Sequence, residues 1–497
     1  MSVEKTSSTP EVDEKGSEVI LEETSHEQAA RFAPGTIVID EVAEKKLVRK
    51  WDKILLPLLM IIYLLGYLDR TNMGNARLMG LTTDVLGGDP TGQRYAWINS
   101  AFYFAYIIFQ YPGTIFGKYF PQNIWLGLAA TGWGVCCTLQ ATSFNFAGLF
   151  VARFGVGVFE SMFSPNMSLY FTFFYTRKEI GKRLGIWFAC ASIAGAFGGL
   201  IAYGVQHIKS SVQLWKLLFI IEGIPAVIFG LSSIYLLPDR PETTKYLTEE
   251  ERALAIVRMN RGGQKEVEGT LNKAHVKAAF KDWKIYLYGA IYFGVNTAAS
   301  ALGAFLPTII AQLGFTAAQA QLLTVPPYAA GAAILIATNF ISDHFQSRGI
   351  PMVFASLWGG IGYLLLLVST SVGVRYFATF LITSSTYTVI GLSIAWFPYN
   401  MGSESKRAAG IPVFQSIGQC GSICGSNIFP TADAPRYFKG FGLSCGFSFA
   451  TALVAAAMTV FFRYENARRD REYGVIDRNA PVDTSDADDS KGFRYTV

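Results

Sequence analysis

Apolar runs long enough to cross a membrane recur along this chain from Ile54 to Phe462. Each run has roughly 18–25 residues, and a helix of that length spans the ~30 Å of hydrocarbon in a lipid bilayer. No run shows the regular alternation of apolar and polar residues that is typical of a membrane-spanning barrel. Only 16% of the residues are charged, whereas a water-soluble domain carries about 25%. We therefore predict an all-α membrane protein embedded in the lipid bilayer.

The hydropathy of the chain predicts twelve spans in two groups of six. With a window of about 19 residues, the spans fall at 54–78, 95–117, 123–142, 145–174, 182–207, 214–237, 284–312, 319–343, 350–370, 374–398, 408–430 and 441–463. The predicted domains are a disordered N-terminal tail (1–43), a six-helix bundle (44–237), a central loop (238–283), a second six-helix bundle (284–464) and a disordered C-terminal tail (465–497). This arrangement is typical of transporters that bind their substrate near the membrane midplane, between two halves that rock.

Most basic residues lie beside the predicted spans. If the spans alternate in direction, four clusters share one face of the membrane: Lys45, Lys46, Arg49, Lys50 and Lys53; Arg177, Lys178, Lys182 and Arg183; Lys406 and Arg407; Arg463, Arg468, Arg469 and Arg471. Lys and Arg in short loops favour the cytoplasmic side, so we expect both termini in the cytoplasm and, by default, the plasma membrane as the location. Topology thus accounts for the net charge of +5, and no nucleic acid is expected as a partner.

Two charged residues, Asp69 and Arg70, lie in the segment YLDRTN at the end of the first predicted span. Ionisable side chains inside a membrane are costly and usually face a cavity or a partner, so each is a functional candidate. The alternative is an ion pair at the helix end that reaches water at the membrane surface. Tyr67 and Asn72, in the same segment, are added as candidate substrate contacts.

The fourth predicted span carries a second charged pair, Arg153 and Glu160. Two helical turns separate them, so they share a face about 10 Å apart, too far for direct pairing. Each therefore needs a partner elsewhere, and Asp69 and Arg70 are the obvious ones. A guanidinium binds a carboxylate through two hydrogen bonds, and a poorly solvated acid can exchange protons near neutral pH. The four residues predict an anion site coupled to protons; a buried charge network that holds the two helices together is a compatible alternative.

The remaining polar residues inside the spans give a weaker indication. Glu222 stands beside Gly223 and Pro225, and we interpret it as structural, at a helix break or a close helix contact. The second half has no equivalent charged face, and its candidate substrate contacts are Asn296, Trp396, Asn400 and Gln415. Hydrogen bonding between helices explains these four side chains equally well.

Several classes of site cannot be assembled from the sequence. The four histidines fall in predicted loops or in the N-terminal tail, so neither a metal cluster nor a catalytic triad is expected. All six cysteines lie inside predicted spans, where thiols pack as small apolar groups. No glycine-rich loop for ATP phosphates is present. We therefore expect no enzyme activity and no metal or cofactor, with H+ as the coupling ion.

Three segments together resemble one known family. They are YLDRTNMGNA from Tyr67, RFGVGVFESMFSP from Arg153 and LPDRPETTKYLTEEER from Leu237. They resemble the fungal allantoate-permease-like branch of the anion:cation symporters, in the major facilitator superfamily, and the resemblance covers most of residues 45–465. It implies a major-facilitator-type fold and the proton-driven uptake of a small organic anion, a carboxylate or vitamin precursor such as nicotinate, pantothenate or allantoate. We expect the protein to be a monomer.

The resemblance also implies roles for individual residues. By position in the segments, Asp69 and Glu160 would be the protonation sites, and Arg70 and Arg153 would handle the anion. The loop signature of the superfamily is only partly kept, because Gly117 stands where the acid of the first loop belongs. Asp343 keeps the acid of the corresponding second loop, so it is our candidate for a gating-loop residue.

Three other functions stay open at this stage. The same helices could export a secondary metabolite, because the direction of net flux is not written in the sequence. The protein could instead be a nutrient receptor that binds without transporting and signals through its long tails. An integral-membrane enzyme is the third, although neither a nucleophile, a metal set nor a cofactor motif is found.

Overall fold

The computed structural model describes residues 41–117, 119–260, 273–430, 433–434, 436–475 and 487–497. Within these ranges every regular element is a helix, and twelve helices have 19 or more residues. These are α2 (Glu41–Leu78), α4 (Gln93–Gly117), α5 (Gln122–Gln140), α6 (Phe146–Phe174), α7 (Arg177–Gln206), α8 (Leu214–Leu236), α11 (Trp283–Ala311), α13 (Val325–Phe345), α14 (Gly349–Val368), α15 (Val372–Tyr399), α16 (Glu404–Asn427) and α17 (Phe438–Tyr473). The shorter helices are α3 (Leu81–Leu86), α9 (Glu249–Asn260), α10 (Lys273–Lys281), α12 (Ala317–Leu322) and η2 (Ala487–Asp489). The predicted all-α fold of twelve long helices is confirmed.

Nine of the described helices are long and apolar enough to cross a membrane. Helices α4, α5 and α16 lie outside this group. Glycines at their helix contacts contribute to the lower mean hydropathy of these helices. A Cβ added to Gly134 of α5 would lie 2.7 Å from the backbone nitrogen of Val227 in α8. A glycine at such a contact lowers the hydropathy of a span while it allows close packing.

Three predicted spans differ from the observed helices. The first helix begins at Glu41 rather than near residue 54, so the basic segment before the apolar run is helical. The predicted span 319–343 is split into α12 and α13, and prolines occupy the first turn of α13, a position that proline favours. The last helix continues to Tyr473, ten residues beyond the predicted 463.

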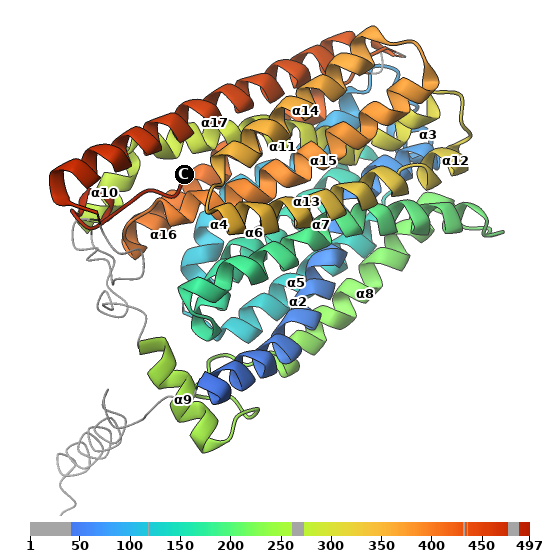
Figure 1. Cartoon of the computed structure of the whole chain (residues 1–497). Helices are drawn as coiled ribbons and strands as arrows, with labels where there is room; N and C mark the ends of the chain where they lie inside the picture. Colours follow the sequence, from blue (N-terminus) through green and yellow to red (C-terminus); the bar gives the residue numbers. More distant parts are fainter. Residues whose placement is uncertain (1–40, 118, 261–272, 431–432, 435, 476–486) are drawn as a thin grey trace, which may run out of the picture.

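The long helices lie side by side and alternate in direction (Figure 1). We call the end where α2 begins and α17 finishes the tail end, and the opposite end, where α3 and α12 lie, the far end. Helices α2 to α8 form the first helix set and α11 to α17 the second. Within the first set the closest pairs are α5 with α8 and α4 with α6, and within the second they are α11 with α16 and α14 with α17. The two sets meet where α2 packs on α11, α4 on α16 and α7 on α13.

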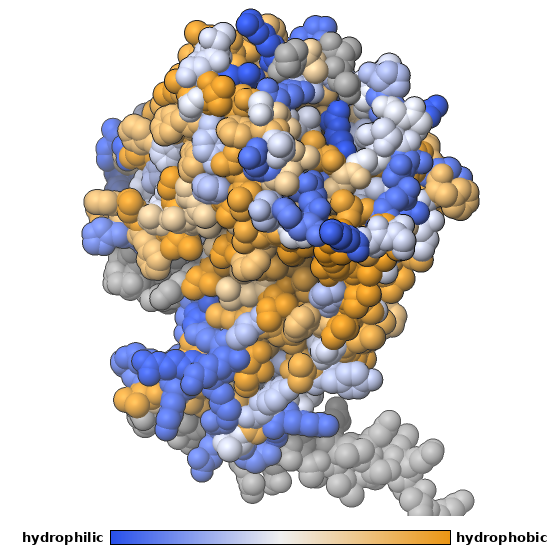
Figure 2. All heavy atoms as spheres, turned by 90° about the vertical axis from the view of Figure 1, so that its right-hand side faces the viewer, coloured by the Kyte–Doolittle hydropathy of each residue, from blue (hydrophilic) through white to orange (hydrophobic). Residues whose placement is uncertain are grey.

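Large apolar side chains are exposed on the outside of the long helices. Broad apolar areas are visible between hydrophilic ones in Figure 2. Ile108 of α4 is 57% exposed and Leu453 of α17 is 72% exposed. Water-soluble proteins seldom expose large contiguous apolar surfaces, so these side chains fit contact with lipid.

The predicted disorder of residues 465–497 is wrong for the parts that the structure describes. Residues 465–473 continue α17, and residues 487–497 dock on the tail end of the second helix set. Asp488 is 1% exposed and pairs with both Lys284 and Lys406. The ring of Tyr495 stacks on Phe462 at 4.7 Å. The low apolar content of the segment suggested disorder, but two buried ion pairs and an aromatic stack hold it.

The central loop also holds more structure than a surface helix. Arg258 of α9 is 1% exposed and donates to Glu44 of α2 at 2.8 Å, and it also pairs with Glu179 of α7. The helix is therefore fastened to the first helix set at the tail end. Residues 261–272 of the predicted loop and 1–40 of the predicted N-terminal tail lie outside the described residues. The division into two half-domains stays a prediction.

Candidate functional site

A buried ion pair joins Arg70 of α2 to Glu160 of α6. The Arg70 Nε donates to Glu160 Oε1 at 2.5 Å, and a guanidinium terminal nitrogen contacts the same oxygen. Glu160 is 3% exposed, and the Arg70 side chain is 18% exposed. The other carboxylate oxygen of Glu160 has no hydrogen-bond partner in the described part of the chain. Glu160 thus meets a base of the first span, the inter-helix pairing that the sequence predicted, while its role in transport stays a prediction.

Aromatic rings surround the Arg70 guanidinium. Its central carbon lies 5.1 Å from the ring centre of Tyr67, 5.2 Å from that of Phe102 and 5.6 Å from that of Tyr106. Rings at this distance attract a cation electrostatically. The ring of Tyr67 also lies 6.2 Å from that of Tyr387 in α15. The ion pair therefore lies beside the contact between the two helix sets, where a transporter of this architecture binds its substrate.

Arg153 binds the backbone of α2 instead of a carboxylate. Its Nη1 donates to the carbonyl oxygen of Asp69 at 2.7 Å and its Nη2 to that of Arg70 at 3.4 Å. Arg153 is 3% exposed. The expected pairing of Arg153 with an acid of the first span is not seen in this structure, because Arg153 holds the adjacent helix by its peptide groups; the anion site of the four residues stays a prediction.

Asp69 lies away from the Arg70–Glu160 ion pair. Successive residues of a helix point about 100° apart, so Asp69 and Arg70 face different neighbours. Asp69 is fully buried, and its Oδ1 accepts from the thiol of Cys137 in α5 at 2.9 Å and from Asn72 at 3.5 Å. Its Oδ2 has no partner among the described residues. Asn72 accordingly lies beside Asp69, not beside the guanidinium of Arg70.

Glu222 of α8 lies in the same buried region as Asp69. The proximity of these two acids was not predicted from the sequence. Glu222 is 1% exposed, and neither of its carboxylate oxygens has a hydrogen-bond partner among the described residues. It lies within electrostatic range of Asp69 and Cys137. The sequence signal is an intramembrane acid beside Gly223 and Pro225, which we interpret from the sequence as structural.

Two of the four candidates in the second helix set lie inside their helices without contacting a charged group. Asn296 is 8% exposed and donates to the carbonyl of Tyr292, one turn earlier, at 2.8 Å. Tyr292 lies within electrostatic range of Tyr67 and Arg70, so Asn296 is close to the ion-pair region. Gln415 is half-buried, and its carbonyl oxygen has no partner in the described part.

The other two candidates hold the C-terminal segment at the tail end. Trp396 Nε1 donates to the carbonyl of Thr496 at 2.8 Å, and Asn400 Oδ1 accepts from the Thr496 amide at 2.7 Å. The tail uses their polar atoms in this structure, and their assignment as substrate contacts stays a prediction. Asp343 pairs with Arg348 at 2.9 Å, where α13 ends and α14 begins; its gating role stays a prediction.

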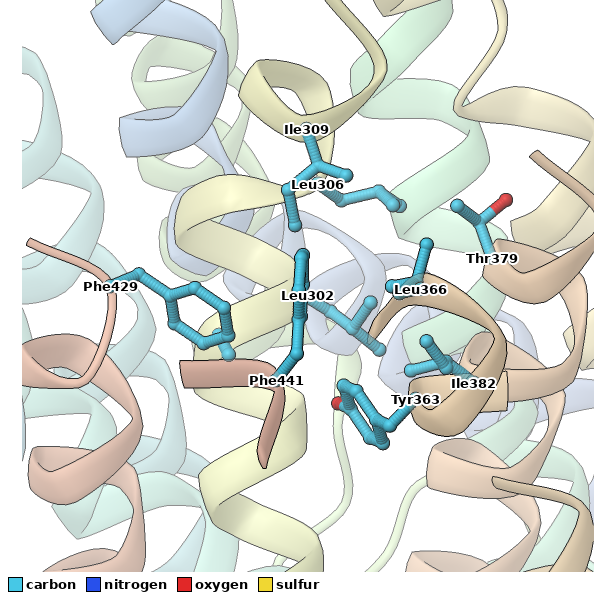
Figure 3. A pocket seen from close by; sticks show the side chains of 10 residues that line it. Leu302, Leu306, Ile309, Tyr363, Leu366, Thr379, Ile382, Phe429 and Phe441 are labelled. Atoms are coloured by element: carbon cyan, nitrogen blue, oxygen red, sulfur yellow. The ribbon is translucent and has the colours of Figure 1, made fainter. Parts of the chain in front are cut away.

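A separate pocket lies within the second helix set (Figure 3). The only polar side-chain groups among its lining residues are the hydroxyls of Tyr363 and Thr379, and the others are apolar: Ala301, Leu302, Leu306, Ile309, Leu366, Ile382, Phe429 and Phe441. A pocket without a charged side chain has nothing to neutralise a carboxylate, so it does not fit an anion. Among the described residues no group of three or more His, Cys, Asp and Glu could hold a metal ion.

Twelve long helices in two sets, with a buried ion pair beside the contact between the sets, define a polytopic membrane transporter. Comparison with known proteins gives the family. The sequence model of the Major Facilitator Superfamily matches residues 59–426 of this chain. The chain belongs to the Major Facilitator Superfamily, and it is a multi-pass membrane transporter and not an enzyme.

Named relatives agree with this family. The major facilitator-type transporter hxnP of Emericella nidulans is 34% identical over 473 residues, which cover 92% of this chain and 94% of the relative. The MFS-type transporter efuF of Hormonema carpetanum is 33% identical over 475 residues, which cover 95% and 96%.

Solved structures agree with the fold. A D-xylose–proton symporter superposes with a TM-score of 0.63 at 14% identity over 80% of this chain and 95% of that one. An inward-facing bacterial homologue of the human lysosomal transporter Spinster gives 0.61 at 14% identity over 84% and 96%.

Proposed function

We propose that this transporter imports a small organic anion together with protons by alternating access. The observation that carries the proposal is the buried ion pair of Arg70 and Glu160 beside the contact between the helix sets. An arginine is suited to bind a carboxylate through two parallel hydrogen bonds. In this structure the Glu160 carboxylate binds the Arg70 guanidinium, at the position that the substrate carboxylate would take.

Protonation of Glu160 couples the two ligands. A protonated Glu160 no longer neutralises Arg70, and an unpaired charge in a buried site is costly. The carboxylate of a substrate then replaces Glu160 on the guanidinium, while Tyr67, Phe102 and Tyr106 stay around it. Loss of the proton on the other side of the membrane lets Glu160 return to Arg70 and displaces the anion.

Contacts between the helix sets at the far end support alternating access. A Cβ added to Gly74 would lie 2.5 Å from the carbonyl oxygen of Gly303, so the backbones of α2 and α11 touch. Tyr95 Oη donates to the carbonyl of Ala304 at 3.1 Å, and Gln321 Nε2 donates to that of Asn75 at 3.3 Å. Access from the far end requires these contacts to separate, as rocking of the two sets would do.

The orientation and the subfamily are part of the same proposal. Basic residues such as Lys50, Arg183 and Arg258 lie at the tail end, which supports a cytoplasmic position for this end and for both termini. The plasma membrane is the location we propose, with the protein as a monomer. The three sequence segments support the allantoate-permease-like branch, and with it carboxylates or vitamin precursors as the substrate class.

Uptake into cells tests the proposal. Cells that produce the protein are given a panel of radiolabelled carboxylates at acidic and at neutral pH, beside Glu160→Gln and the matched control Glu249→Gln, whose side chain is 88% exposed. We expect acid-stimulated uptake of at least one anion, loss of the acid stimulation in Glu160→Gln, and no change in the control. Absence of uptake with normal surface expression would favour export or a receptor role.

A further inference from the structure

We propose that Glu222 and Asp69 form a second proton-binding site, in which two carboxyl groups hold one proton on a different face of α2 from the transport ion pair. Glu222 is then a proton-coupling residue in addition to Glu160. The coupling role rests on the proposed proton-driven transport, whereas the proton-binding pair does not.

The carboxyl group of Glu222 is buried without a polar partner in the described part of the chain. The residue is 1% exposed, and both of its carboxylate oxygens lack a hydrogen-bond partner among the described residues. The amide of Asn72 lies nearby, but outside hydrogen-bond geometry. An ionised carboxylate without partners is strongly unfavourable in an apolar interior, and such a group takes up a proton instead.

The charged side chain near Glu222 is a second acid, Asp69. The groups that act on Glu222 electrostatically are Asp69 and Asn72 of α2 and Cys137 of α5. Asp69 in turn is in range of Cys137 and of Arg153 and Glu160 in α6. No cation acts on Glu222 among the described residues, and the guanidinium of Arg153 is used by two backbone carbonyls. The Cys137 thiol, which donates to Asp69, also lies 4.0 Å from the carbonyl oxygen of Phe219, about one turn before Glu222. Two carboxylates within electrostatic range in a poor dielectric repel each other when both are ionised, so the pair retains a proton.

Close helix packing keeps this site dry. A Cβ added to Gly223, next to Glu222, would lie 2.4 Å from Thr138 Oγ1 and 2.8 Å from the Thr138 amide nitrogen. The backbones of α8 and α5 therefore touch beside the carboxyl group, and no space is left there for a layer of water. A proton reaches the pair only when α2, α5 and α8 move apart.

The position of the pair links it to transport. Helix α2 carries Arg70 towards the substrate site and Asp69 towards α5 and α8. A change in the charge of the Asp69–Glu222 pair acts on the same helix turn that binds the anion. The pair thus favours one position of α2 when protonated and another when ionised.

Infrared difference spectroscopy tests the pair without any substrate. The purified protein in lipid vesicles is compared at neutral pH with Glu222→Gln, Asp69→Asn and the control Glu249→Gln. We expect a band of a protonated carboxyl group that is lost in Glu222→Gln, retained in the control and shifted or lost in Asp69→Asn. A band unchanged in both site variants would overturn the proposal. Size-exclusion profiles show which variants are folded, and Glu222→Asp, which restores an acid, should recover the band if Glu222→Gln is unstable.

Transport stoichiometry tests the coupling role. With an anion found in the uptake panel, we expect Glu222→Gln to lower the number of protons carried per anion by one, while Glu160→Gln abolishes acid stimulation. An unchanged proton number in Glu222→Gln would overturn the coupling role and leave the pair as a proton-binding site. If the infrared band is present but no anion is transported, the proposed function fails while the pair stands.

Discussion

Arg153 in α6 donates a 2.7 Å hydrogen bond to the backbone carbonyl of Asp69 in α2, although the Asp69 carboxylate lies on the same residue. The guanidinium therefore fastens two transmembrane helices through peptide groups. Together with the Arg70–Glu160 ion pair, this side chain joins α2, which carries Asp69, to α6, which carries Glu160.

Replacing Arg153 should therefore destabilise the protein. Arg153→Lys keeps the charge but cannot reach both carbonyls with a planar fork, and hydrogen bonds that involve a charged group contribute about 1.5–3 kcal/mol each. We expect a clear fall in the thermal unfolding temperature in detergent. Arg468→Lys is the control because Arg468 is 55% exposed. Equal unfolding temperatures for the two variants would contradict this role.

The Arg70–Glu160 ion pair should show strong coupling in a double-mutant cycle. Removal of one partner of a buried pair costs about 3–5 kcal/mol, because the other charge is left alone. We expect Arg70→Met and Glu160→Gln each to lower stability, and the double variant to be more stable than the sum of both losses predicts. Thermal unfolding of the four proteins gives the coupling energy. Additive losses would show that the two side chains do not interact.

The tail should stay docked far below neutral pH. Burial raises the pKa of Asp488, but the positive charges of Lys284 and Lys406 outweigh it and lower the pKa from 3.8 to about 2. A depressed carboxyl pKa stabilises the docked state above the unfolded value and loses this contribution as the pH falls through the folded value. We expect pepsin to leave the tail intact just above pH 3.8 and to cleave it as the pH approaches about 2.

A matched variant separates this effect from general acid unfolding. Asp488→Asn removes the charge that Lys284 and Lys406 neutralise, so its tail should be cleaved at both pH values. The neighbouring Asp489, which is exposed, supplies the control Asp489→Asn. A tail that stays protected in Asp488→Asn would show that the two ion pairs are not required and that the aromatic stack and the hydrogen bonds of Trp396 and Asn400 hold it.

A methyl group at Gly74 should open the far end. The Cβ of Gly74→Ala would lie 2.5 Å from the carbonyl oxygen of Gly303, and a backbone atom cannot give way as a side chain can. We expect α2 and α11 to separate there, and a cysteine at Gln321, which is fully buried, to react several-fold faster with a membrane-impermeant maleimide. Gly204→Ala is the control, because nothing lies within 4 Å of its added Cβ. Equal labelling in both variants would contradict the closure.

The sequence predicted the helices well because the bilayer imposes a simple rule. Backbone groups in hydrocarbon must be satisfied within the segment, so an apolar run of sufficient length becomes a helix. The pairing of Glu160 with the first span also followed from the cost of a lone intramembrane charge. The cost of a lone charge indicates which residues need partners, but not which partner each residue contacts.

The contacts that were missed involve groups that a sequence does not display. Arg153 binds backbone carbonyls, which every residue possesses. Glu222 is interpreted as structural from the sequence because its neighbour Asp69 is distant along the chain. Trp396 and Asn400 bind backbone groups of Thr496, about a hundred residues further along the chain, and hydropathy does not reveal such a contact.

Each helix set carries its own appendage at the tail end. Arg258 fastens α9 to the first set through Glu44 and Glu179, and Asp488 fastens the C-terminal segment to the second set through Lys284 and Lys406. Two dyes, one on α9 and one on the C-terminal segment, would therefore report the distance between the two helix sets throughout the transport cycle. Their energy transfer would follow the angle between the sets in single molecules, without a label inside the membrane.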